Sequence, residues 1–308
     1  MEISVTFLDN LNAQESLRID KLLGQGKFKV FQAYCATRKT NYAVKVFPAD
    51  RCGNILYRKE KKFSQLSHPN IIQSIPATSN DGEFHVQLLE LAKFGDFFDV
   101  VQDGLLSNNR VLMRTYFHQL VKGVEYMHSN GVAHLDLKLE NIMLGNNFQL
   151  KIIDFDGSQA LSSKTPFSRG TRDYRAPELI HGNCKDFAAA DIYSMGIILY
   201  ILKTGELPFQ EEQEGSANSG SPSLKFRSDK QAFWTEKSAR FGPTFLGQEF
   251  IELIDGMLEC DPLKRFNMED VKNSRWYQGT IYGEEELTKT MKPKWREAND
   301  KKDNHKIY

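Results

Sequence analysis

Over roughly the first ninety residues, apolar and polar positions alternate in short runs that are separated by turn-forming residues. A period of two is typical of a β-strand with one buried face. The pattern predicts strands at 17–23, 30–36, 41–46 and 86–91, with a glycine-containing turn after the first strand. A helix is expected at 57–66, where His68-Pro69-Asn70 stops it. This part of the chain is therefore predicted to be mainly strands.

After about residue 94 the apolar residues recur every three or four positions, which is the helical period. One predicted helix carries five of them on a single face: Leu112, Tyr116, Leu120, Val124 and Met127. A second, very apolar helix is expected at 189–202, with Gly205 and Pro208 beyond it as stop signals. Its aliphatic run, 195–202, is far shorter than the roughly 20 residues of a membrane span. We therefore expect a buried core helix and no membrane span.

Strands followed by helices indicate an α+β fold with two lobes and a ligand site in the cleft between them. Residues 211–223 are rich in Glu, Gly and Ser, which predicts a surface loop. The chain after residue 281 is charged and poor in apolar residues, so we expect it to be mobile or draped on the surface. The predicted units are an N-terminal extension, a small lobe, a large lobe and a charged tail, at 1–16, 17–91, 92–280 and 281–308.

Composition narrows the class of protein. The 308 residues hold 40 Lys plus Arg and 40 Asp plus Glu, and this balance gives no electrostatic case for nucleic-acid or membrane-surface binding. The four cysteines have neither disulfide-framework nor zinc-site spacing, which favours reduced thiols. Residues 1–10 lack a signal-peptide apolar core. We therefore expect an intracellular, cytoplasmic protein.

Two features of the strand-rich part suit phosphate binding. Gly24 and Gly26 lie in the turn between two predicted strands, where glycine lets backbone N–H groups approach phosphate oxygens closely. Lys45 follows Ala43 and Val44 on a strand, and a lysine among apolar residues is costly unless it meets anions. Each feature also has an ordinary interpretation, because many glycine turns are only turns and many strand lysines extend to solvent.

A polar cluster follows the first long helix. It contains Asp136, Lys138 and Asn141, and Asp154 comes thirteen residues after Asn141, at the end of a strand-like segment. Asp136 could accept a proton from an attacking hydroxyl, and Lys138 could neutralise a transferring phosphoryl group. The oxygens of Asn141 and Asp154 suit Mg²⁺. An ordinary loop with helix caps is a poor explanation for so many polar groups beside apolar strands.

The ordered set of motifs resembles the eukaryotic protein kinase superfamily. The order is the glycine turn, Lys45, residues 134–141, Asp154-Phe155-Asp156-Gly157, Ala176-Pro177-Glu178, Asp191 and Arg265. Each motif is modest evidence, but the full set over residues 17–278 is specific. Lys138 and Thr171 resemble the serine/threonine type, and the general appearance is closest to the calmodulin-dependent kinase group. The resemblance implies a bilobal kinase fold with the active site in the cleft.

The resemblance also implies a function, which is transfer of the γ-phosphate of MgATP to serine or threonine of protein substrates. Asp136 would orient and deprotonate the acceptor hydroxyl, and Thr171 would line the acceptor pocket. Lys45 would hold the α- and β-phosphates, and Lys138 would steady the γ-phosphate. The metal would be held by Asn141 and Asp154.

Further nucleotide contacts are implied around the cleft. Val30, Ala43 and Met143 would enclose the adenine. The backbone at Glu90 and Ala92 would bind its edge. The remaining implied residues are Gly24 and Gly26 in the phosphate turn, Glu60 as the partner of Lys45, Asp96 near the ribose or a substrate arginine, and the structural ion pair of Glu178 with Arg265.

Three positions depart from the family pattern. Leu135 replaces the arginine that usually grips an activation-segment phosphate, so phosphorylation of Ser162, Ser163, Thr165 or Ser168 is not expected to act through that contact. Asp156 replaces a glycine; aspartate tolerates the left-handed region, although its carboxylate could disturb metal binding. The glycine turn is one residue short, and its Lys27 or Lys29 could reach the phosphates, although two solvated lysines are the ordinary interpretation.

Two acidic residues bear on the choice of substrate, and two rival functions remain open. Glu140 and Asp96 match acids that relatives use to bind basic residues ahead of the phosphorylation site, while Ile201 stands where a third acid is expected. Two solvated carboxylates are the ordinary interpretation. A pseudokinase that binds nucleotide or a partner is the main rival function, and a kinase of small molecules or lipids is the second. Pro293 argues against a continuous helix in the basic, aromatic part of the tail.

Overall fold

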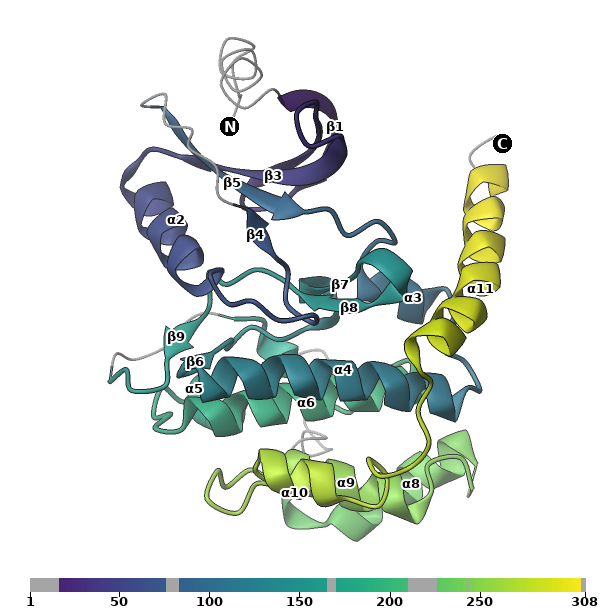
Figure 1. Ribbon diagram of the computed structural model, residues 1–308. Helices are drawn as coiled ribbons and strands as arrows, with labels where there is room; N and C mark the ends of the chain where they lie inside the picture. Colours follow the sequence, from purple (N-terminus) through teal and green to yellow (C-terminus); the bar gives the residue numbers. More distant parts are fainter. Residues whose placement is uncertain (1–16, 76–82, 165–169, 210–225, 243, 306–308) are drawn as a thin grey trace.

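The protein is described here by a computed structural model that covers residues 17–75, 83–164, 170–209, 226–242 and 244–305. A small lobe built on a sheet stands above a larger helical lobe, and the C-terminal helix lies along one side (Figure 1). This arrangement confirms the α+β, two-lobed fold. The predicted N-terminal extension and the loop at 211–223 lie outside the described residues.

The small lobe contains a five-stranded antiparallel sheet. Its strands are ordered β1-β2-β3-β5-β4. They span Leu17–Gln25 (β1), Lys29–Cys35 (β2), Thr40–Pro48 (β3), Ser74–Ile75 (β4) and Phe84–Glu90 (β5). Ala33, Val44, Val46 and Leu88 lie in its core. The four strands expected from the alternating pattern are all present, with ends shifted by a few residues.

Helix α2 (Arg51–Phe63) packs beside this sheet (Figure 1). It begins six residues before the expected start, because Asp50 caps it by accepting a 2.7 Å hydrogen bond from the Gly53 amide. Aspartate is a preferred N-cap residue, since its carboxylate satisfies an amide that has no partner within the helix. The cap fixes α2 against β3, so Glu60 is held on the buried side of the helix.

The large lobe is mainly helical. Its helices are α3 (Phe97–Gln102), α4 (Arg110–Ser129), α5 (Pro177–Ile180), α6 (Phe187–Thr204), α8 (Lys230–Phe241), α9 (Gln248–Met257), α10 (Met268–Asn273) and α11 (Glu284–His305). Two short strand pairs, β6 (Val132–Ala133) with β9 (Gln159–Ala160) and β7 (Ile142–Leu144) with β8 (Leu150–Ile152), lie between α4 and α5 in the sequence. Three 3₁₀ turns complete the lobe: η1 (Leu139–Asn141), η2 (Asn146–Phe148) and η3 (Arg172–Tyr174).

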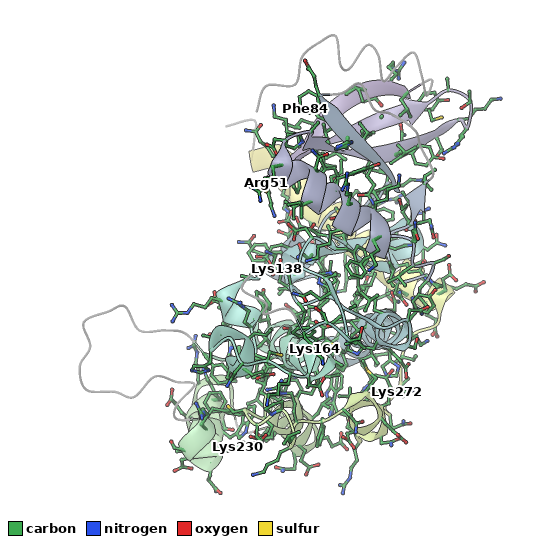
Figure 2. The ribbon with its side chains drawn as sticks, turned by 90° about the vertical axis from the view of Figure 1, so that its left-hand side faces the viewer. Arg51, Phe84, Lys138, Lys164, Lys230 and Lys272 are labelled. Atoms are coloured by element: carbon green, nitrogen blue, oxygen red, sulfur yellow. The ribbon has the colours of Figure 1, made fainter. Side chains whose placement is uncertain are left out.

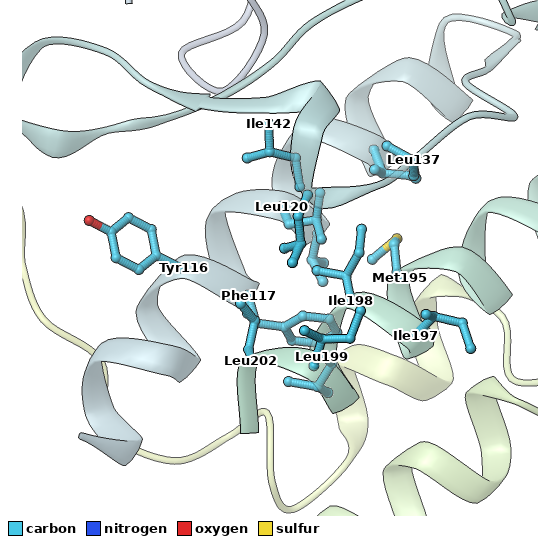
Figure 3. Packing of buried hydrophobic residues seen from close by; sticks show 14 of the residues in the cluster. Tyr116, Phe117, Leu120, Leu137, Ile142, Met195, Ile197, Ile198, Leu199 and Leu202 are labelled. Atoms are coloured by element: carbon cyan, nitrogen blue, oxygen red, sulfur yellow. The ribbon is translucent and has the colours of Figure 1, made fainter. Parts of the chain in front are cut away.

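The core of this lobe forms between α4 and α6. The five apolar residues predicted to share one face of α4 are all buried. Figure 3 shows Phe117 and Leu120 of α4 close to Ile198 and Leu199 of α6. By length and composition alone α6 could cross a membrane, but 78% of it is buried inside the molecule. The interpretation of α6 as a core helix is therefore confirmed.

The charged tail lies along one side of the molecule, which agrees with one of the two expected alternatives (Figure 1), but its helix was not expected. Residues 284–305 form the helix α11, and that helix continues through Pro293. Apolar residues recur on one of its faces, where Leu287 and Met291 are buried and Trp295 packs against the core. A proline inside a helix removes one hydrogen bond and costs about 3 kcal/mol. Burial of this apolar face offsets that cost, and the charged composition of the tail concealed the face.

Candidate active site

Where the two lobes meet, Lys45 holds two carboxylates. Its ammonium group lies 3.0 Å from Glu60 Oε2 and 2.8 Å from Asp154 Oδ1. Lys45 comes from the central strand β3, Glu60 from α2, and Asp154 follows β8, so the contact joins three separate segments. The expected Lys45–Glu60 pair is present, and it is buried.

The protonation states of the three groups differ. Burial favours the neutral form of Lys45, but the Glu60 and Asp154 carboxylates outweigh it and raise the pKa of Lys45 well above its usual value. Burial likewise opposes ionisation of Asp154, yet Lys45 lowers its pKa below the usual range. For Glu60 burial is the largest cause, and it raises the pKa to about 7 against the opposing effect of Lys45. Lys45 and Asp154 are therefore charged at neutral pH.

Asn141 and Asp154 stand at neighbouring ends of the β7–β8 pair. The Ile153 amide donates to the Asn141 carbonyl at 3.0 Å, which aligns the two residues. Asp154 has a φ of 64°, in the left-handed region that aspartate tolerates better than most residues. The backbone itself therefore turns the Asp154 carboxylate toward Lys45.

These two side chains fit the Mg²⁺ that the kinase resemblance implies. The Asn141 amide nitrogen donates to Asp136, at 2.8 Å to its carbonyl and 3.1 Å to Oδ2, which leaves the Asn141 side-chain oxygen as an acceptor. Carboxylate and amide oxygens are the ligands that Mg²⁺ takes. No group of three or more His, Cys, Asp or Glu side chains is arranged to hold a metal within the described residues. Mg²⁺ usually binds proteins through one or two carboxylates together with water and phosphate oxygens.

Asp136 is positioned by the segment that carries Thr171. Its Oδ1 accepts the Thr171 amide at 2.9 Å and the Thr171 hydroxyl at 3.2 Å. Lys138 donates to the same hydroxyl at 2.8 Å and lies 3.6 Å from Asp136 Oδ2. Figure 2 shows Lys138 at the level where the two lobes meet. The structure therefore brings Asp136, Lys138 and Thr171 together, as the sequence predicts.

The backbone beside Asp136 is fixed from the core. Asp191, at the start of α6, is fully buried and accepts the amides of His134 and Leu135 at 2.8 Å each. It also contacts the ring of His128 at 2.9 Å. Leu135 has a φ of 64°, and its side chain is only 2% exposed. Asp191 stands in one of the sequence motifs, but its bonds to these two amides were not predicted.

The residues implied in adenine and ribose binding stand on β2, β3, β5 and β7 and near the start of α3. Val30 pairs with Lys45 and Ala43 with Leu89 in the sheet, and Asp96 forms a β-bridge with Met143. The Glu90 carboxylate binds Lys151 at 2.7 Å and the Gln73 amide at 2.9 Å, and the Glu90 amide donates to the Gln73 carbonyl at 2.9 Å.

Asp96 is also a helix cap, because its Oδ1 accepts the Asp99 amide at 2.8 Å. Ala92 packs against the core. Gly24 and Gly26 lie at the strand end and in the turn that joins β1 to β2, and a Cβ added at either one would meet no atom within 4 Å.

Two of the departures from the family pattern, Asp156 and the short glycine turn, are connected in space. Asp156 lies outside the left-handed region, so the need for glycine is absent there, and Asp154 takes the left-handed conformation. Lys27, in the short turn 26–28, forms an ion pair with Asp156. Lys27 is 48% exposed, so the expectation of a solvated lysine is only partly right. In the sequence, the only signal for this pair was the presence of two opposite charges at positions that depart from the family pattern. Whether they pair depends on how the two lobes are placed against each other.

The structural pair of Glu178 and Arg265 forms as expected. Arg265 donates two hydrogen bonds to the Glu178 carboxylate, at 2.6 and 2.9 Å, and a third to the Ala189 carbonyl at 2.8 Å. A two-pronged contact of this kind is strong and geometrically specific. It ties the start of α5 to the loop before α10.

Comparison with known proteins agrees with this geometry. The protein kinase domain model matches residues 17–277. CBL-interacting protein kinase 11 of Oryza sativa subsp. japonica is 32% identical over 275 residues, which cover 85% of this chain and 51% of the relative. Serine/threonine-protein kinase SIK1 of Rattus norvegicus is 31% identical over 268 residues, 84% of this chain and 32% of the relative. The SNF-related serine/threonine-protein kinase of Homo sapiens is 30% identical over 269 residues, which cover 85% of this chain and 33% of the relative. The chain thus spans about a third to a half of these relatives.

Proposed function

The chain belongs to the protein kinase domain family, and on that premise we propose that it transfers the γ-phosphate of ATP to serine or threonine hydroxyls of proteins. The observation that carries the proposal is the joint placement of Asp136, Lys138 and Thr171 beside the Lys45–Asp154 pair. The names of the relatives, all serine/threonine or CBL-interacting kinases, support the same substrate class.

In this proposal each side chain has one task. Asp136, whose carboxylate is held by Thr171, orients the acceptor hydroxyl and takes its proton. Lys138 stands beside Asp136 with a positive charge for the transferring phosphoryl group. Lys45 holds the non-transferred phosphates, and Glu60 keeps Lys45 in place. Mg²⁺, held by Asn141 and Asp154, supplies neutralisation of phosphate charge when bound.

The pseudokinase alternative would be favoured by the loss of one of the four groups that the chemistry requires. Lys45, Asp136, Asn141 and Asp154 are all present and meet at one place. Leu135 and Asp156 remain the features that this alternative can cite. A catalytic role is therefore the function that the geometry supports best.

The proposal is tested by phosphate transfer from MgATP to a mixed serine and threonine peptide library. The wild type should transfer, and Asp136→Asn should lose about 10²–10⁴-fold in rate, which is the usual contribution of a positioned base. Asp173→Asn is the matched control, because this acid is exposed on the same segment as Thr171. ATP binding without transfer by the wild type would instead support the pseudokinase.

We also propose a preference for arginine or lysine ahead of the acceptor residue. Glu140 is exposed next to the catalytic segment, and Asp96 has one oxygen outside its helix cap. In the same library, peptides with upstream basic residues should be the better substrates for the wild type, and Glu140→Gln should reduce that preference. Equal rates on basic and neutral peptides would contradict the proposal.

A further inference from the structure

The turn between β1 and β2 is tied to the segment after β8 by an ion pair. The strands close at the Gln25–Lys29 pair, so the turn consists only of residues 26–28 and Lys27 stands within it. The Lys27 ammonium group contacts Asp156 Oδ2, from a segment 129 residues away. The side chains are 48% and 14% exposed, so solvent reaches the lysine more than the carboxylate.

Both charges lie next to the Lys45 group. Asp156 is two residues after Asp154, which binds Lys45. Burial raises the pKa of Asp154, whereas Lys45 and, after it, Lys27 lower that pKa. Asp156 in turn adds a small rise to the pKa of Glu60, which burial dominates. The pair therefore lies within electrostatic reach of the groups assigned to the phosphate chain.

We propose that Lys27 and Asp156 form a clasp that holds the β1–β2 turn down in the nucleotide-free protein, and that a polyphosphate ligand takes Lys27 over from Asp156. The inference rests on the proposed function, because it needs a nucleoside di- or triphosphate as the ligand. What it adds to a phosphate-binding turn is the competition between the ligand and Asp156 for Lys27, which is the phosphate-sensing role of the pair.

The direction of each effect follows from charge. A phosphate chain carries more negative charge than one carboxylate, so it competes for the exposed Lys27 ammonium group. Once Lys27 has moved, Asp156 is left as an unpaired negative charge close to the bound phosphates and opposes them. Lys27 therefore strengthens and Asp156 weakens the binding of phosphorylated ligands. Adenosine, which has no phosphate, should be indifferent to both.

The first experiment uses the protein without nucleotide. Amide hydrogen exchange of residues 24–29 is compared among the wild type, Lys27→Gln, Asp156→Asn and the double variant. If the clasp exists, each single change speeds exchange in the turn by about 2–5-fold, the range of an exposed ion pair, and the double variant adds little further. Unchanged exchange, or two effects that simply multiply, would overturn the clasp. This result does not depend on catalysis.

The second experiment measures the affinity of the same proteins for ATP, ADP and adenosine by calorimetry without peptide substrate. Asp156→Asn should bind ATP about 3–10-fold more tightly and Lys27→Gln should bind it more weakly by a similar factor. Adenosine affinity should stay the same. Lys21→Gln is the matched control, because Lys21 is an exposed lysine on strand β1, which leads into the turn; this change should alter the affinity for neither ATP nor adenosine.

The possible results distinguish a failure of the phosphate-sensing role from a failure of the proposed kinase function. An Asp156→Asn protein that binds ATP no more tightly, or that shifts ATP and adenosine equally, overturns the phosphate-sensing role. A wild type that binds none of the three ligands overturns the proposed function, while the exchange experiment still decides whether the clasp exists. Thermal unfolding of each variant identifies any that have failed to fold, and the charge-swapped Lys27→Asp/Asp156→Lys protein then replaces it, with restored protection of the turn expected.

Discussion

At the scale of single residues, Lys45 stands between two carboxylates that experience different surroundings. Asp154 is about a third exposed and keeps its charge, whereas Glu60 is buried and has its pKa raised to about 7. A buried carboxyl ionises only where a nearby cation compensates for the loss of hydration, and here Lys45 is shared. Of these three groups, Glu60 is therefore the one whose protonation changes most with pH near neutrality.

Glu60 should make stability depend on pH between about 4.5 and 7. In this window the unfolded chain loses the Glu60 proton and the folded chain keeps it, so the free energy of unfolding falls as pH rises. Above the folded pKa the loss is complete. Relative to Glu60→Gln, the wild type should lose on the order of 3 kcal/mol between pH 4.5 and pH 8.

Urea unfolding of the two proteins across this range measures the difference, and the comparison cancels groups common to both. Asp154 titrates below the window because its pKa is lowered, and Lys45 titrates above it. Parallel stability curves for wild type and Glu60→Gln would show that Glu60 is ionised throughout.

Leu135 leads to a second expectation at this scale. Its side chain is buried in the core of the large lobe and offers no donor to a phosphate group. Phosphatase treatment should therefore leave most of the peptide-transfer activity in place, with intact mass confirming that phosphate has been removed. A loss of activity on dephosphorylation would mean that another cation binds the phosphate. Thr165 and Ser168 lie outside the described residues, so the mass measurement must cover them.

The main site residues could be predicted because their spacing is local. Asp136, Lys138 and Asn141 fall within six residues, and Asp154 follows after one short strand pair, so sequence order nearly determines their proximity. The Lys27–Asp156 pair could not be predicted in this way. Its partners are 129 residues apart and meet only when the two lobes are placed against each other. The same holds for the two amides on Asp191.

At the scale of elements, helix α11 supports the segment that joins the lobes. Trp295 packs edge-on against Phe94, with ring centres 5.2 Å apart, and Phe94 stacks on Phe148 at 3.9 Å. Lys302 adds ion pairs to Asp99 and Asp103, at 3.0 and 2.8 Å. The helix is thus attached at the start of the large lobe, next to the residues assigned to the ribose.

Met291→Ala tests whether α11 belongs to the cooperative core. Met291 is fully buried, so its truncation should lower the free energy of unfolding by about 2–5 kcal/mol through lost burial and the cavity left behind. Lys292→Ala, one position along on the exposed side, should change it by less than about 0.5 kcal/mol. Chemical denaturation of both variants measures this. Equal, small effects would mean that α11 unfolds separately.

Element prediction succeeded where one period dominated. In α4 the large apolar residues recur without interruption, and the observed helix, Arg110–Ser129, contains all five of them. In α11 the apolar positions are three or four apart too, but lysines and glutamates fill the spaces and Pro293 interrupts the polar face. Average composition then outweighed periodicity in the prediction, although only the buried face determines whether such a helix forms.

At the scale of the whole molecule, buried polar contacts join segments that are distant in sequence. Glu178 and Arg265 are 87 residues apart, and both are nearly inaccessible to water. Arg114 of α4 donates to the Trp276 carbonyl at 2.5 Å and to the Thr280 carbonyl at 3.0 Å. These contacts fix the base of the large lobe to the helices above it. The two-lobed fold was predictable from strands followed by helices, and the family resemblance implied the pair of Glu178 with Arg265, but the attachment of Arg114 was not anticipated.

Glu178→Ala should be strongly destabilising, because it leaves the Arg265 charge buried without its partner. The expected loss is about 3–5 kcal/mol in the free energy of unfolding. The matched control is Glu125→Ala, which breaks the exposed pair with Lys272 and should cost less than about 1 kcal/mol. Thermal and denaturant unfolding give both values. A similar, small loss in the two variants would show that water reaches Arg265.

The attachment of Arg114 also sets an order of events during synthesis. Arg114 leaves the ribosome 162 residues before Trp276, the carbonyl that it binds. At about 5–20 residues per second this interval lasts roughly 8–30 seconds. During that time α4 exists without the chain segment that satisfies its buried guanidinium group. The nascent large lobe therefore has to remain incompletely folded, and open to chaperones, until nearly all of the kinase domain has been made.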